Sequence, residues 1–227
     1  MYQYLLFDAD NTLLDFDLAE QEALRSTLVH TPLGFSEAIY RLYHTINDQE
    51  WKRLERGETT RSRLRTERFI KLHEALGHSL DPAGAETVAQ AFLEHMAKQS
   101  ALIDGALETV TVLAEKYALY IVTNATSWVQ KKRMARTPLM PYFQKIYISH
   151  DMGCAKPERI FFDKVLADIG DDRRGTYLVI GDSLSSDIAG ARVAGLDSCY
   201  FDPGKKGCGT EFPKWTIRTL PQLLDIL

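Results

Sequence analysis

The apolar positions at the start of the chain form one short run that ends in acidic residues. Residues 4–7 are apolar or aromatic, and the polar stretch Asp-Ala-Asp-Asn-Thr follows at 8–12. This pattern is typical of a buried strand with polar residues at its tip. Beyond it, apolar positions recur at helical spacing, with proline and glycine between the segments. The spacing predicts helices only, over residues 18–29, 37–54, 60–76 and 82–97.

From residue 104 onward, helical and strand-like segments alternate. Helices are predicted over 106–116, 128–135, 157–169 and 186–194, strands over 119–123, 145–149, 177–180 and 198–201, and a last helix from 220. Such alternation predicts a parallel sheet with helices on both faces. The sequence therefore predicts an α/β fold with a doubly wound, Rossmann-like parallel sheet. Residues 1–15 and 101–227 would form this core domain, and residues 16–100 an inserted helical cap domain.

Composition narrows the class of protein. The chain has 227 residues, of which 45% are hydrophobic and 26% charged, so it can bury a sizeable core and is not expected to be disordered or fibrous. Its net charge of −4 disfavours binding to a nucleic acid polymer through a basic field. The apolar runs are far shorter than the roughly 20 residues of a membrane span, so no membrane association is expected.

Cysteine usage and the N-terminal pattern predict a cytoplasmic location. Cys154, Cys199 and Cys208 are odd in number and lie in no metal-ligand spacing, which favours neither a disulfide framework nor a zinc site. The first residues lead directly into the predicted strand, without the pattern of a secretory signal. No pattern in the sequence specifies an oligomeric state.

Polar residues follow the predicted strands at the edge of the sheet where ligands bind in open α/β folds. Asp8 and Asp10 are two residues apart and point to the same side if the tip stays extended. Asp182 follows another strand and is expected nearby. Clustered carboxylates repel one another, so either their pKa values rise or a cation binds among them. Oxygen ligands beside phosphate oxygens are typical of Mg²⁺.

The other strand ends add the remaining groups that phosphoryl transfer requires. A carboxylate can attack phosphorus to form an aspartyl phosphate, while a second one acts as general acid and base. Thr123 supplies a hydroxyl, and Pro157 suits the first position of a helix, which would put Lys156 at a positively polarised N-terminus. Asp187 either supports this site or only favours the helix macrodipole. Together, the carboxylates, the Thr123 hydroxyl and the Lys156 ammonium predict phosphoryl transfer.

Together these residues resemble the haloacid dehalogenase-like hydrolase superfamily. The superfamily has four ordered motifs, and the matching residues here are Asp8-x-Asp10-x-Thr12, Thr123-Asn124, Lys156-Pro157 and Gly181-Asp182-(x4)-Asp187. The helical insert after the first motif resembles a class I cap. Stretches 8–17 and 46–60 are similar to the bacterial pyrimidine 5′-nucleotidase branch. One departure is Ala125, where many relatives have glycine.

The resemblance implies a role for each motif residue. Asp8 would be the nucleophile and Asp10 the general acid and base. The groups implied as phosphate ligands are Thr123, Asn124 and Lys156. The groups implied as Mg²⁺ ligands are Asp8, Asp182 and the backbone carbonyl of Asp10, with Asp187 in support.

The sequence favours a Mg²⁺-dependent phosphomonoester hydrolase acting on a small phosphorylated metabolite. The finer resemblance makes that substrate a nucleoside 5′-monophosphate, with a pyrimidine base. The acid at position 10 disfavours a dehalogenase, which needs no proton donor for an ester oxygen. A sugar-phosphate phosphatase or a phosphomutase remains an alternative. Outside the enzymes, a phospho-aspartate signalling receiver has similar residues, but receivers are much shorter and have no cap.

Aromatic and basic residues of the predicted cap are candidates for contact with the rest of the substrate. The candidates are Trp51, Arg65, Arg68 and Phe69. The alternative is that Trp51 anchors the cap core and that the arginines line a solvated helix face.

Overall fold

The computed structural model describes residues 1–29, 31–210 and 212–227 and divides the chain into two compact units. The core unit contains Met1–Phe16 and Ser100–Leu227, and the helical unit contains Asp17–Gln99. Within the described residues, all strands belong to the core unit. None of the described helices combines the length and apolar character needed to cross a membrane.

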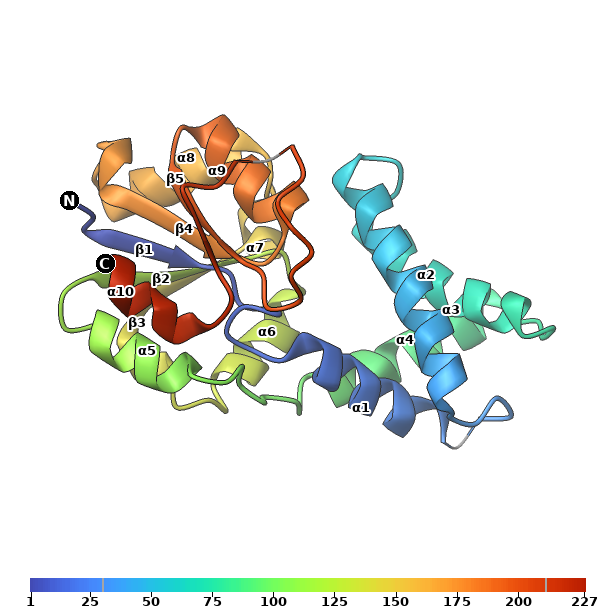
Figure 1. Cartoon of the computed structure of the whole chain (residues 1–227). Coiled ribbons are helices and arrows are strands. Elements are labelled where there is room, and N and C mark those ends of the chain that lie inside the picture. Colours follow the sequence, from blue (N-terminus) through green and yellow to red (C-terminus); the bar gives the residue numbers. More distant parts are fainter. Residues whose placement is uncertain (30, 211) are drawn as a thin grey trace. The chain divides into compact units, whose positions relative to one another are not determined.

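One six-stranded sheet, parallel throughout, forms the centre of the core unit among the described residues (Figure 1). The strand order is β3-β2-β1-β4-β5-β6, which confirms the predicted doubly wound fold. The strands are β1 (Tyr4–Phe7), β2 (Ala118–Thr123), β3 (Phe143–Ile148), β4 (Tyr177–Gly181), β5 (Asp197–Phe201) and β6 (Trp215–Ile217). The order of the strands reverses between β1 and β4, and such a switch point is where ligands bind in open parallel sheets.

Helices cover both faces of this sheet (Figure 1). One face carries α5 and α10 and the other carries α8 and α9. The helices of the core unit are α5 (Ala106–Leu113), α6 (Ser127–Met134), α7 (Ser149–Met152), α8 (Arg159–Ile169), α9 (Ala189–Ala194) and α10 (Leu223–Ile226). Short turns of other helix types are η1 (Met140–Tyr142), η2 (Arg174–Thr176), the π-helical η3 (Leu184–Ile188) and η4 (Leu220–Gln222).

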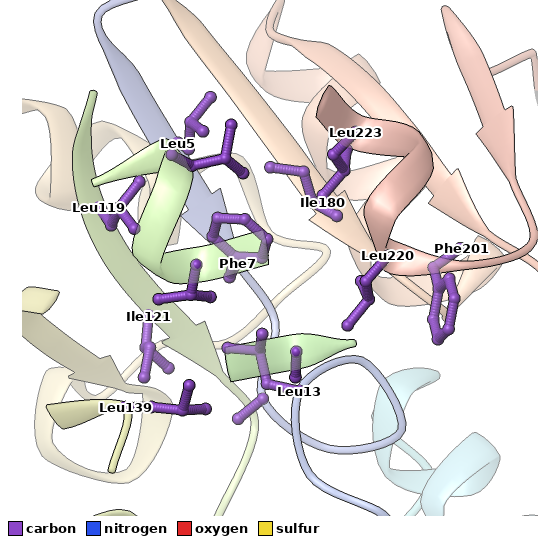
Figure 2. Packing of buried hydrophobic residues seen from close by; sticks show 14 of the residues in the cluster. Leu5, Phe7, Leu13, Leu119, Ile121, Leu139, Ile180, Phe201, Leu220 and Leu223 are labelled. Carbon is purple, nitrogen blue, oxygen red and sulfur yellow. The ribbon is translucent and has the colours of Figure 1, made fainter. Parts of the chain in front are cut away.

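Alternate residues of the strands bury themselves on opposite faces, because side chains of a strand alternate in direction. Leu5 and Phe7 of β1 pack with Ile121 and Ile180 on the face that α10 covers (Figure 2). Leu6 belongs to the cluster on the other face. Burial on both faces holds β1 rigidly at the centre of the sheet, and its tip therefore positions the residues that follow.

The helical unit contains four helices among its described residues, and three of them begin with a side-chain N-cap. The helices are α1 (Phe16–Leu28), α2 (Glu37–Glu55), α3 (Arg61–Ala75) and α4 (Pro82–Met96), with α1 starting at the last residue of the core unit's first segment. Ser36, Thr60 and Asp81 each accept a backbone N–H of the helix that follows. Tyr43 and Phe92 form an aromatic cluster with Phe69, with ring centroids 5.4 to 5.6 Å apart.

Several segments differ from the sequence-based prediction, among them the start of α8, residues 186–194 and β6. Helix α8 begins at Arg159 with Glu158 as its N-cap, so Pro157 is not its first residue and Lys156 does not lie at its N-terminus. The predicted helix 186–194 is a π-helical turn followed by α9. The short strand β6 was not predicted, because its three residues lie at the sheet edge and pair only with β5.

Candidate active site

The segment after β1 folds back on itself and holds two carboxylates at the switch point. The backbone N–H of Asp8 donates to the Ile180 carbonyl at 2.8 Å, which continues the pairing of β1 with β4. Leu13 N then donates to the Ala9 carbonyl at 2.9 Å and closes the loop. Asn11 sits at its bend with φ +57°, a left-handed conformation that asparagine tolerates better than most residues. The Asp8 side chain is buried, whereas that of Asp10 is partly exposed.

Lys156 brings a buried positive charge to the same point. Its Nζ donates to Asp8 Oδ1 at 2.5 Å, to Asp187 Oδ1 at 2.6 Å and to the Val122 carbonyl at 2.8 Å. These acceptors satisfy the three donors of an ammonium group. The lysine predicted to lie near the acidic cluster therefore contacts it directly.

Three carboxylates converge around this lysine from two strand ends. Oxygen atoms of Asp8, Asp182 and Asp187 all lie within 4.8 Å of one another. The second oxygen of Asp187 accepts the Ser183 N–H at 3.1 Å, which anchors this side chain to the turn after β4. A Cβ atom on Gly181 would lie 2.6 Å from the Asp187 Cβ, so only glycine leaves room for the carboxylate there.

Burial and mutual repulsion shape the protonation of these groups. Burial raises the pKa of Asp8 well above its usual value, against the opposing effect of Lys156. Burial and the neighbouring Asp187 carboxylate raise the pKa of Asp182 to about 7. Burial alone would lower the pKa of Lys156, but Asp187 and Asp8 outweigh it and raise that pKa. One lysine therefore faces three carboxyl groups, and keeping all three ionised would need a further cation.

Asn124 holds the lysine segment in place. Its Nδ2 donates to the Lys156 carbonyl at 2.8 Å, and its Oδ1 accepts the Lys156 N–H at 3.1 Å. The side chain of Asn124 is therefore engaged with the backbone of Lys156, whereas the anion contact predicted after Thr123 involves backbone N–H groups. Thr123 is buried at the end of β2, one residue before Asn124. Thr12 makes a long contact of 3.5 Å from its hydroxyl to Asp182.

A buried arginine that the sequence analysis did not single out contacts the second carboxylate. Arg133 Nη1 donates to Asp10 Oδ1, and the arginine side chain is only 1% exposed. The signal in the sequence is its phase on α6, where the buried residues are Val129, Gln130, Arg133 and Met134. A charged residue on the buried stripe of a helix needs a partner, and here that partner is Asp10.

Comparison with known proteins agrees with this arrangement of residues. Residues 2–195 match the family model for the haloacid dehalogenase-like hydrolase. The chain belongs to this hydrolase family. It is 38% identical to the HAD-hydrolase YfnB of Bacillus subtilis over 227 residues, covering 100% of this chain and 95% of the relative. The crystal structure of YfnB bound to magnesium superposes with a TM-score of 0.94 at 36% identity, covering 100% of this chain and 98% of the other.

Two of the full-length relatives of this hydrolase are pyrimidine 5′-nucleotidases. The pyrimidine 5′-nucleotidase PynA of Streptococcus pneumoniae is 33% identical and is covered over 95% of its length by this whole chain. The pyrimidine 5′-nucleotidase YjjG of Escherichia coli is 29% identical and is covered over 98%, again by the whole chain. The family and fold expected from the four motifs are confirmed.

The acidic cluster of this hydrolase fits a divalent cation. Its donors are all carboxylate oxygens, the ligand type that Mg²⁺ prefers, and they lie close enough to share one ion. Lys156 Nζ donates to Oδ1 of Asp8 and to Oδ1 of Asp187, and the Ser183 N–H donates to Oδ2 of Asp187. Asp8 and Asp182 are therefore the better candidates for direct ligands, with Asp187 in support.

The four candidate substrate residues lie in the helical unit and differ in environment. Phe69 is fully buried in the aromatic cluster, and Arg68 is 4% exposed with its guanidinium over the Phe69 and Phe92 rings. These two residues pack the interior of the helical unit, contrary to the expected substrate contact. Trp51 is half-buried beneath the Arg61 guanidinium. Arg65 is partly exposed and pairs with a glutamate of α4, Glu86.

Proposed function

We propose that the protein is a phosphomonoester hydrolase whose substrates are nucleoside 5′-monophosphates, with pyrimidine bases preferred. The observation that carries the proposal is the convergence of Asp8, Lys156 and Asp182 at the switch point of the sheet, with Asp10 on the same loop. Two pyrimidine 5′-nucleotidases among the full-length relatives support the choice of substrate.

In the first half of the reaction Asp8 acts as the nucleophile. A carboxylate oxygen of Asp8 attacks phosphorus and forms an aspartyl phosphate, while the bond from phosphorus to the nucleoside 5′-oxygen breaks. Asp10 donates a proton to that leaving oxygen. Thr123 holds a phosphoryl oxygen by hydrogen bonding, and Lys156, whose three donors are engaged by Asp8, Asp187 and Val122, offsets the phosphoryl charge.

The second half returns the enzyme to its starting state. Asp10, now ionised, takes a proton from a water molecule as the oxygen of that water attacks phosphorus. The bond between phosphorus and Asp8 breaks, and inorganic phosphate leaves. Asp8 and Asp182, with Asp187 in support, would hold Mg²⁺, whose positive charge would offset that of the phosphoryl group and the carboxylates.

The helical unit supplies the candidates for recognition of the nucleoside. Trp51 offers an aromatic surface and Arg65 a positive charge, whereas Arg68 and Phe69 would support them from the interior. Binding energy from a base remote from phosphorus can be used to orient the phosphoryl group. A nucleotide is therefore expected to exceed its base-free sugar phosphate in turnover as well as in binding.

A phosphate-release assay with Mg²⁺ tests this function. The substrates are dUMP, dTMP, AMP, ribose 5-phosphate and β-glucose 1-phosphate, compared by kcat/KM, with Asp8→Asn as the blank. The expected order puts dUMP and dTMP first and ribose 5-phosphate well below them. A preference for either sugar phosphate would overturn the nucleotidase assignment in favour of a sugar phosphatase or mutase. A long-lived phosphoprotein without phosphate release would instead indicate a signalling receiver.

A further inference from the structure

Arg133 is one of the largest fully buried side chains among the described residues, and it carries a charge. Its Nη1 donates to Asp10 Oδ1 and to Gln130 Oε1, the latter at 3.2 Å. Its guanidinium carbon lies 5.8 Å from the centre of the Phe16 ring. One nitrogen of the guanidinium thus binds both Asp10 and Gln130 at the loop that carries Asp10.

The position of the Arg133 side chain follows from the start and the phase of helix α6. The helix begins at Ser127, four residues after the end of β2, so its first turn starts beside the carboxyl edge of the sheet. Residues 129, 130, 133 and 134 form its buried face, whereas Lys131 and Lys132 point away and are exposed. Among three consecutive basic residues, only Arg133 has the helical phase that reaches Asp10.

A buried guanidinium is a poor choice for stability alone. Removing such a charge from water is costly, and apolar residues of similar volume often serve the fold equally well or better. What the guanidinium adds is geometry, because its planar, fixed donors specify where a carboxylate oxygen lies. The Asp10 side chain is 24% exposed and not held by burial, so it depends on such a partner for its orientation.

We propose that Arg133 is a positioning residue for Asp10. It fixes Oδ1 and leaves Oδ2 to donate a proton to the leaving oxygen and then to take one from the attacking water. Gln130 in turn holds Arg133 through Nη1. This inference rests on the proposed function, since it concerns the acid and base of that same reaction. It assigns the α6 segment a part in catalysis that lies outside the four motifs.

A double-mutant cycle with two leaving groups tests the inference. Arg133→Met keeps the length of the buried stem and removes the charge, and Lys131→Met is the matched control on the exposed side of α6. For dUMP, whose leaving oxygen needs a proton, Arg133→Met should lower kcat about 10- to 100-fold with KM changed little. For p-nitrophenyl phosphate, whose leaving group needs none, the loss should be severalfold smaller.

The cycle is completed with Asp10→Asn. If Arg133 acts through Asp10, the double variant should be no slower than Asp10→Asn alone, whereas independent effects would multiply. If Arg133→Met does not fold, Arg133→Lys takes its place in the cycle with Asp10→Asn. Three results would overturn the positioning role while the wild-type activity stands. They are equal losses of kcat for the two esters in Arg133→Met, effects of the two substitutions that multiply, and a change in KM without a change in kcat. A wild-type protein that releases phosphate from neither ester would overturn the proposed function, and the inference with it.

Discussion

Lys156 donates a hydrogen bond from Nζ to Asp187 Oδ1 at 2.6 Å, and both side chains are 1% exposed. The pair joins the segment that precedes α8 to the turn that follows β4. Because the same ammonium also reaches Asp8, one positive charge is shared by two buried carboxylates. Asp187 is thereby a partner of the lysine and does more than favour a helix dipole.

Removal of the shared charge should destabilise the protein strongly. Lys156→Met leaves buried carboxylates without their cation, and breaking such a pair typically costs about 3–5 kcal/mol of unfolding free energy. Urea unfolding with a chelator present measures the loss. The control is Lys145→Met, whose exposed partner is Asp168, and it should leave the urea midpoint unchanged. Equal midpoints for the two variants would contradict the importance of the buried pair.

A single methyl group at Gly181 should displace Asp187. The added Cβ would lie 2.6 Å from the Asp187 Cβ, closer than carbon atoms pack, so Gly181→Ala forces a shift that costs about 1–3 kcal/mol. Phosphate release should fall along with stability. Gly175→Ala is the control, since a Cβ there meets nothing within 4 Å. The argument fails if both alanine variants keep wild-type activity.

Strand ends were the part of the site that the sequence could predict. An apolar run followed by Asp8, or by Asp182, marks the carboxyl edge of a parallel sheet, and that edge brings distant segments together. Arg133 escaped prediction because its neighbours Lys131 and Lys132 have the same charge, and only the exact helical phase separates them. The role of the Asn124 side chain could not be predicted, because a sequence does not reveal that a backbone segment 32 residues away binds its amide.

Loss of the nucleophile and loss of the acid should be distinguishable. Asp8→Asn should reduce phosphate release to the level of a protein-free blank for every ester, because an amide cannot form the aspartyl phosphate. Asp10→Asn should cost about 10²- to 10⁴-fold for nucleotides and less for aryl phosphates. Asp48→Asn, at an exposed carboxylate of α2, serves as control. Equal losses for aryl and alkyl esters in Asp10→Asn would argue against its acid role.

Magnesium should stabilise the folded protein as well as support turnover. A ligand that binds only the native state adds about 2.7 kcal/mol at a hundred times its Kd, so thermal unfolding reports binding without an assay of activity. The wild-type Tm should rise with added Mg²⁺, and Asp182→Asn should reduce that rise because it removes one carboxylate of the cluster. Asp168→Asn, on the surface, should respond like the wild type. An unchanged Tm in the wild type would count against the metal site.

The helical unit should lose stability as pH rises from about 6.5 through the raised pKa of His44. His44 Nδ1 lies 2.7 Å from Oε2 of the buried Glu20, and this hydrogen bond, outweighing partial burial, raises the pKa of His44, with Asp17 and Asp48 adding to the effect. A raised folded-state pKa gives stability that is complete below the unfolded value of about 6.5 and disappears as pH rises through the folded value. The urea midpoint should therefore fall over that window in the wild type, and His44→Gln should make the fall smaller. His78→Gln, at an exposed histidine, should retain it. An NMR titration that gives His44 a pKa at or below 6.5 would refute the coupling.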